Sequence, residues 1–170
     1  MNKNLLLSCI LLLFLCSCKK KKTSLFLLKS GKTTNIAFNN RILETDSFNI
    51  LTEEYIFNGG GVAIADFDND MDLDIFVVAL AQDLEGDETT KSKLYRNNND
   101  GSFTDVTAQV GFTNLHPVIT EIDDFFGLKG FKHGVSWGDY NNDGFPDLVF
   151  THSNKLQLFI NQNGVFTEVT

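Results

Sequence analysis

Cysteine is scarce in this chain and is confined to one end of it. The 170 residues include three cysteines, Cys9, Cys16 and Cys18, and all of them lie in the first 18 positions. The rest of the sequence therefore excludes a disulfide framework, and it also excludes a zinc site built from cysteines.

Basic residues are also in short supply. The chain has 14 Lys and Arg against 22 Asp and Glu, which gives a formal net charge of −8. Nucleic-acid-binding proteins present a basic face, so this balance argues against a nucleic-acid partner. The basic block Lys19 to Lys22 is interpreted as part of a tether that contacts anionic lipid head groups or is simply solvated.

Familiar catalytic motifs are missing as well. The sequence has no strand–turn–helix nucleophile elbow, no HExxH motif and no acid–base pair that stands apart from its acidic loops. Its Gly59-Gly60-Gly61 run lacks the Lys-Ser/Thr of a phosphate-binding loop and predicts a bulge or a close backbone approach. The sequence therefore does not predict an enzyme.

The first 17 residues predict a secretory signal peptide. Lys3 gives a positive start, Leu5 to Leu15 form the apolar segment, and Ser17 is the small residue before Cys18. The apolar segment is shorter than the roughly 20 residues that a transmembrane helix needs. The tetrad Leu15-Cys16-Ser17-Cys18 resembles a bacterial lipobox, whose last cysteine is lipidated; the alternative is an ordinary cleaved signal with incidental cysteines.

A row of five aspartates dominates the middle of the chain. They occupy every second position within an apolar, strand-like run: Asp66, Asp68, Asp70, Asp72 and Asp74. Like charges this close repel one another and raise one another's pKa unless a cation neutralises them. A hard ion such as Ca²⁺ takes roughly six to eight oxygen ligands, which a tight acidic loop can supply.

The same pattern occurs twice. The segment from Gly61, GVAIADFDNDMDLDIFVV, aligns without gaps to the segment from Gly134, GVSWGDYNNDGFPDLVFT. Strand-like segments from Lys93 and Lys155 follow in each copy. We interpret residues 59–110 and 133–170 as two four-stranded repeats, the second incomplete at its end, because such units bury their faces against neighbours of the same kind.

The remaining segments are assigned around these repeats. Residues 18–25 hold the lipidated Cys18 and a basic tether, and residues 26–58 read as short N-terminal strands. Residues 111–132 are interpreted as a loop-like insertion, with a short helix around Ile119 to Phe126. The fold class predicted from the residues is all-β.

Both acidic loops predict Ca²⁺ sites, two ions in all. Positions 1, 3, 5 and 9 supply side-chain oxygens and position 7 a backbone carbonyl. The expected ligands are Asp66, Asp68, Asp70, Asp74 and the carbonyl of Asp72 in the first loop, and Asp139, Asn141, Asp143, Asp147 and the carbonyl of Phe145 in the second.

Two alternatives bear on this interpretation. An EF-hand requires Glu at position 12, where this chain has Val77 and Phe150, so it is excluded. Two acidic hairpin turns without an ion remain an alternative. The loops also differ at position 6, where Met71 stands opposite Gly144; a left-handed backbone there costs a non-glycine residue about 1–2 kcal/mol.

The two repeats, each ending in NG or DG followed by Phe-Thr-Asp/Glu-Val-Thr, resemble FG-GAP/VCBS repeats of integrin α-like β-propellers. The overall likeness is to bacterial lipoproteins related to cartilage acidic protein and ASPIC/UnbV proteins. The resemblance implies a partial β-propeller with structural Ca²⁺ in its acidic loops. It also implies a binding or adhesion module anchored in the cell envelope, periplasmic or surface-exposed, with a protein or glycan ligand.

Two repeats cannot close a propeller, which needs about four to eight blades. We therefore expect an N-terminal fragment of a longer protein, or an open two-blade wedge that oligomerises to cover its edges. Two other functions stay open on the sequence: a non-catalytic lobe of an extracellular polysaccharide-active enzyme, and a purely structural envelope protein.

Overall fold

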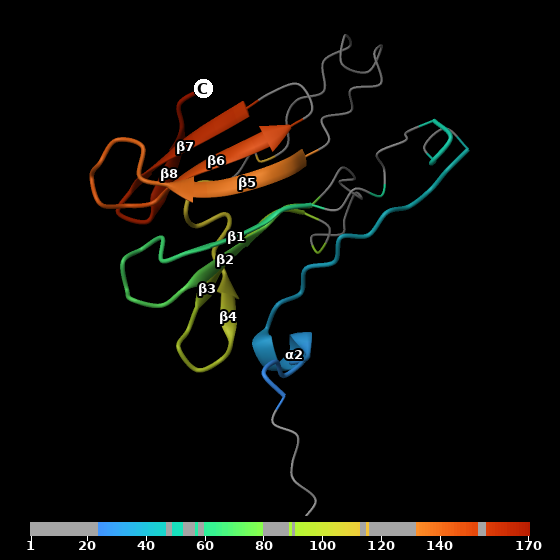
Figure 1. Cartoon of the computed structure of the whole chain (residues 1–170), viewed down its shortest axis with the longest axis horizontal. Coiled ribbons are helices and arrows are strands. Elements are labelled where there is room, and N and C mark those ends of the chain that lie inside the picture. Colours follow the sequence, from blue (N-terminus) through green and yellow to red (C-terminus); the bar gives the residue numbers. More distant parts are fainter. Residues whose placement is uncertain are drawn as a thin grey trace, which may run out of the picture.

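The computed structural model describes residues 24–46, 49–52, 57, 60–79, 89, 91–112, 115, 132–152 and 156–170. They form two four-stranded antiparallel sheets and one short helix (Figure 1). The all-β prediction of two four-stranded blades is confirmed. Within these residues, no helix has the length and apolar character needed to cross a membrane.

The first sheet, blade 1, has its strands in sequence order. They are β1 (Val62–Ala65), β2 (Asp74–Val77), β3 (Lys93–Asn97) and β4 (Phe103–Asp105). The acidic loop joins β1 to β2, and Ala65 pairs with Asp74 where the loop closes. A tight turn joins β3 to β4: Asn98 N–H donates to the Ser102 carbonyl at 3.0 Å, and Gly101 has a φ of 86°.

The second sheet, blade 2, repeats this topology. Its strands are β5 (Lys132–Gly138), β6 (Asp147–His152), β7 (Leu156–Gln162) and β8 (Val165–Glu168). The second acidic loop joins β5 to β6, with Gly138 opposite Asp147. A tight turn at residues 163–164 joins its last two strands, with Val165 paired to Gln162.

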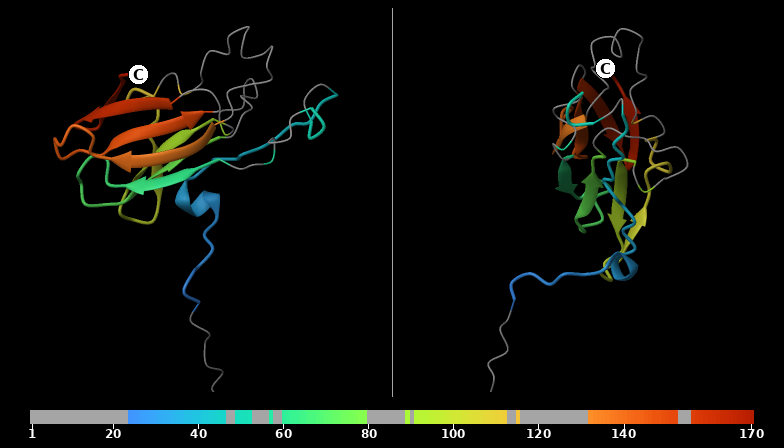
Figure 2. Two further views of the ribbon diagram at one scale, coloured as in Figure 1. Left: turned by 45° about the horizontal axis from the view of Figure 1, so that its top comes forward. Right: turned by 90° about the vertical axis from the view of Figure 1, so that its right-hand side faces the viewer.

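The two blades share one hydrophobic core. Strand β1 lies beside β5, so the first strands of the two sheets are neighbours (Figure 2). Phe76 of blade 1 packs edge-on against Phe150 of blade 2, with ring centroids 6.0 Å apart. The turn after β4 inserts Phe112 between the blades, where its ring stacks on Phe166 at 4.5 Å. These contacts bury the inner face of each sheet against the other.

Glycine permits this close packing at the start of blade 1. A Cβ on Gly60 would lie 1.8 Å from the carbonyl oxygen of Val78, and one on Gly61 would lie 3.2 Å from Cγ1 of Val135. The prediction of a close backbone approach is confirmed at Gly60 and Gly61. Gly59 lies outside the described residues.

The N-terminal region differs from the prediction of short strands. Its described residues before β1 contain no strand; they contain helix α2 (Gly31–Thr34), whose first turn is capped by the Ser30 side chain. Residues 35–40 are held by single contacts instead of a ladder: Asn35 donates to the Phe103 carbonyl and Asn39 to that of Thr89. A strand assignment needs a paired neighbour, which local sequence alone does not reveal.

The short helix expected around Ile119 to Phe126 lies outside the described residues, as does almost all of the 111–132 insertion.

Candidate metal centre

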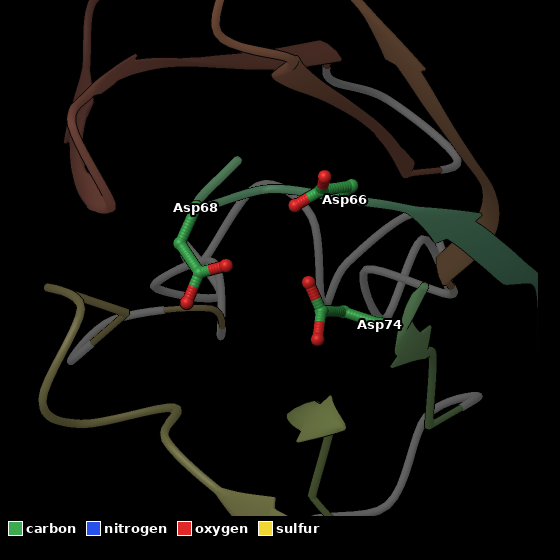
Figure 3. A group of neighbouring side chains, drawn as sticks. All are labelled: Asp66, Asp68 and Asp74. Carbon is green, nitrogen blue, oxygen red and sulfur yellow. The ribbon is translucent and has the colours of Figure 1, made fainter. Parts of the chain in front are cut away.

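Three carboxylates converge at the end of β1 and the start of β2. One oxygen from each of Asp66, Asp68 and Asp74 lies within 4.8 Å of the others, and Figure 3 shows the three side chains facing a common centre. Asp74 is fully buried, whereas Asp66 and Asp68 are partly exposed. Oδ1 of Asp68 is buried and has no hydrogen-bond partner.

Backbone N–H groups donate hydrogen bonds to both oxygens of Asp66 and of Asp74. Asp66 accepts hydrogen bonds from the N–H groups of Asp70 and Met71, at 3.0 and 2.9 Å. Asp74 accepts from Phe67 at 3.1 Å and from Asn97, at the end of β3, at 2.8 Å. Hydrogen bonds to its own carboxylates therefore hold the loop in this shape.

Burial and mutual repulsion disfavour the ionised form of two carboxylates in this loop. Burial raises the pKa of Asp68, and the charges of Asp70 and Asp66 raise it further. Burial also raises the pKa of Asp74 to about 6, although the N–H groups of Asn97 and Phe67 act in the opposite direction. A cation at the centre of the cluster would remove this cost, because it favours the ionised form of every carboxylate around it.

Asp70, the fourth predicted carboxylate ligand, takes another position. Its Oδ1 accepts a hydrogen bond from the Asp72 N–H at 2.9 Å, and it is not part of the group of three. In this arrangement Asp70 closes the turn at residues 70–72. The observed carboxylate set is therefore one residue smaller than the predicted one.

The second loop is built on the same hydrogen bonds. Asp139 accepts from the N–H groups of Asp143 and Gly144, at 3.0 and 2.9 Å. The fully buried Asp147 accepts from Tyr140 at 2.7 Å and from Asn161, at the end of β7, at 2.8 Å. Each bond has its counterpart in the first loop, so the repeat extends from the sequence to the backbone.

The side chains of the second loop are less convergent. Asn141 replaces Asp68, and its amide donates to Oδ2 of Asp143 at 2.8 Å. Oδ1 of Asp143 accepts from the Phe145 N–H at 2.9 Å. Asp139, Asn141 and Asp143 are all exposed. Within the part of the chain that the structure describes, only the first loop gathers three acidic groups.

Left-handed backbone recurs at matching positions of both loops. Asn69 and Asn142 have φ values of 58° and 60°. Met71 and Gly144, at position 6 of each loop, have φ values of 76° and 90°. The expected left-handed conformation at Met71 is therefore observed, and the side chain of Met71 is 92% exposed and gains no burial in return.

One motif that resembles a catalytic one lies next to the second loop. Residues 134–138 read GVSWG and fit the G-x-S-x-G spacing of hydrolase nucleophiles. The whole segment lies inside strand β5, where Ser136 pairs with Val149. A nucleophile elbow needs a sharp strand-to-helix turn at the serine. Ser136 lies within a paired strand, so this segment does not have the geometry of an elbow.

The first loop fits a hard cation by its donor chemistry. It combines an all-oxygen ligand set, a buried carboxylate and an unpartnered carboxylate oxygen. The predicted lipidation site, Cys18, lies outside the described residues.

The fold and the loops define a class: paired four-stranded propeller blades, each with an acidic loop between its first two strands. A family profile described as "FG-GAP-like repeat" matches residues 66–150 and 139–170. The matches cover more than half of the chain, which therefore belongs to this family.

A curated relative extends the comparison. The T-cell immunomodulatory protein homolog of Plasmodium yoelii yoelii is 28% identical over 159 residues. The alignment covers 81% of this chain but 20% of the relative, so the chain spans about one fifth of that protein's length.

Exchanging the position-6 residues should move stability in opposite directions. Met71→Gly removes a left-handed non-glycine residue and should stabilise the protein by about 1 kcal/mol, and Gly144→Ala should destabilise it by a similar amount. Urea unfolding in calcium-free buffer measures both. Equal shifts in the same direction would contradict the assignment of strain to Met71.

Acid should stabilise the calcium-free protein. In the folded protein the pKa of Asp74 is about 6, against an ordinary value of 3.8. The free energy of unfolding that comes from this difference is therefore fully present below about pH 4 and is lost as the pH rises through 6. We expect a higher unfolding midpoint at pH 5 than at pH 7.5 in resin-treated, calcium-free buffer. In Asp74→Asn this part of the pH dependence should disappear; an unchanged dependence in that variant would reassign it to other groups.

Proposed function

We propose that this chain is a calcium-binding, non-catalytic FG-GAP-like repeat module that recognises a protein or glycan ligand outside the cytoplasm. The observation that carries the calcium assignment is the convergence of Asp66, Asp68 and Asp74, together with the buried, unpartnered Oδ1 of Asp68. A buried polar atom without a partner is costly in a folded protein, and an ion is one way to satisfy it.

The ion would act on structure and not on a reaction. Asp66, Asp68 and Asp74 would hold it, with the Asp72 carbonyl as a further oxygen. Its charge would offset the repulsion among carboxylates that close the β1–β2 loop. Asp139, Asn141, Asp143, Asp147 and the Phe145 carbonyl would form a second, more open site of the same type.

Two comparisons support the proposal that the chain binds a ligand: the FG-GAP-like repeat family and the similar Plasmodium protein. FG-GAP-like repeats supply the blade architecture, and the similar Plasmodium protein is named for immunomodulation, which is compatible with a recognition role. The alternatives are a non-catalytic lobe of a polysaccharide-active enzyme and a purely structural envelope protein. Calcium-dependent capture on a protein or glycan array favours recognition; an array with no ligand favours the structural role.

The module would be held at the cell envelope by lipid on Cys18, in the periplasm or at the surface. Further blades would come from a longer polypeptide or from oligomerisation. Support for the anchor comes from the signal-like segment and from the tetrad that ends at Cys18.

Calcium titration by calorimetry tests the ion sites. We expect the unmutated chain to bind two ions and Asp68→Asn to lose the first-loop ion. Because Asp68→Asn also removes a repelled charge, its calcium-free form should unfold at a higher urea concentration than the parent.

Asp72→Asn is the matched control, since it removes one charge from the same loop while keeping the backbone carbonyl. It should retain both ions. A parent protein that takes up no calcium would refute the proposed function.

Metabolic labelling with palmitate in a bacterial host tests the anchor. The full chain should incorporate label and partition with membranes, whereas Cys18→Ser should do neither. Cys16→Ser removes the neighbouring cysteine and should label normally. Labelling that survives in Cys18→Ser would contradict an anchor at this residue.

A further inference from the structure

The first acidic loop lies at the joint between the two blades. Phe67, which stands between Asp66 and Asp68, is 2% exposed, and its ring lies 5.9 Å from that of Phe166 in blade 2. The carbonyl of Phe67 accepts a hydrogen bond of 2.7 Å from Nδ2 of Asn161, at the end of β7. A blade 2 side chain thus holds the backbone between two candidate ligands of blade 1.

A second bridge connects the two loops directly. Nδ2 of Asn69 donates to the carbonyl of Gly144 at 3.2 Å. Asn69 follows Asp68 in the first loop, and Gly144 follows Asp143 in the second. The first loop is therefore bonded to blade 2 on both sides of Asp68, through the Phe67 carbonyl before it and the Asn69 side chain after it.

The repeat shows that the bond from Asn161 to Phe67 is an addition to the blade's own architecture. Asn97 occupies the matching position at the end of β3. Both asparagines accept a hydrogen bond from the following turn, from Asn99 and Gly164 respectively. Both also donate to the carbonyl before the buried aspartate, Leu73 at 3.2 Å and Pro146 at 3.0 Å.

Asn161 makes one further bond, to Phe67, that crosses to the other blade. Among the described residues, Asn97 makes no such crossing bond. The shared bonds belong to each blade by itself, and the extra one belongs to the joint.

We infer that Asn69 and Asn161 are positioning residues that couple ion binding in the first loop to the docking of the two blades. This inference rests on the proposed calcium binding. An ion needs Asp66, Asp68 and Asp74 in one arrangement, and the two bridges restrict the backbone of residues 67–69 to it. Because coupling between two equilibria is reciprocal, the ion stabilises the joint as much as the joint favours the ion.

Calorimetric titration of bridge variants tests the coupling, with the first-loop site identified as the one that Asp68→Asn abolishes. Asn69→Gly keeps the left-handed backbone and removes the bridging amide. It should weaken the first-loop site by about fivefold or more, the usual lower range of coupling between sites.

Asn142→Gly is the matched control, because it makes the same change at φ 60° in the second loop, where the side chain makes no hydrogen bond with the described residues. It should leave the first-loop site within about twofold of the parent.

Asn161→Ala gives a second test of the coupling. It should weaken the first-loop site and also reduce the rise in unfolding midpoint that calcium produces. Should Asn161→Ala fail to fold, the exposed Asn69→Gly variant decides the question alone.

Normal first-loop affinity in Asn69→Gly, whatever its stability, overturns the coupling while leaving calcium binding intact. An unmutated chain that binds no calcium overturns the proposed function itself, and the coupling with it.

Discussion

The fold depends on a buried carboxylate at the ninth position of each acidic loop. Asp74 and Asp147 are both fully buried. Each accepts two hydrogen bonds from backbone N–H groups, one at the start of its loop and one at the end of the third strand of its blade. One side chain thereby joins the loop to strands two and three of a blade. Without it these N–H groups would be left unsatisfied in the interior, which costs about 1–3 kcal/mol each.

This arrangement carries an electrostatic cost that differs between the loops. In the first loop two further carboxylates face Asp74, and burial with like charges raises the pKa of Asp68 and Asp74. In the second loop Asn141 is neutral, and Asp139 and Asp143 are exposed, so the buried Asp147 is the exception. The same backbone thus supports a more buried, strongly charged loop at the blade joint and a more exposed, less charged one in blade 2.

Position within the pair of blades accounts for that difference. The first loop is covered by blade 2, through the Phe67 ring, the Asn161 amide and the Asn69 bridge. Because these contacts bury Asp74 and part of Asp68, a cation would offset a larger electrostatic cost in the first loop than in the second. The same contacts make the first loop part of the interface between the blades. The β1–β2 loop thus contributes to the packing of the two blades as well as to the turn within blade 1.

The sequence by itself determined the repeat, the strands around each loop and the position-6 contrast between Met71 and Gly144, because side-chain alternation, loop spacing and backbone preference are local properties. It also gave the candidate ligands but could not show that Asp70 turns to the Asp72 N–H. The described residues before β1 do not form the expected N-terminal strands, because a strand needs a paired neighbour that local sequence does not reveal. Only the tertiary structure decided which loop lies at the joint between the blades, since the bonds from Asn161 to Phe67 and from Asn69 to Gly144 join residues far apart in the chain.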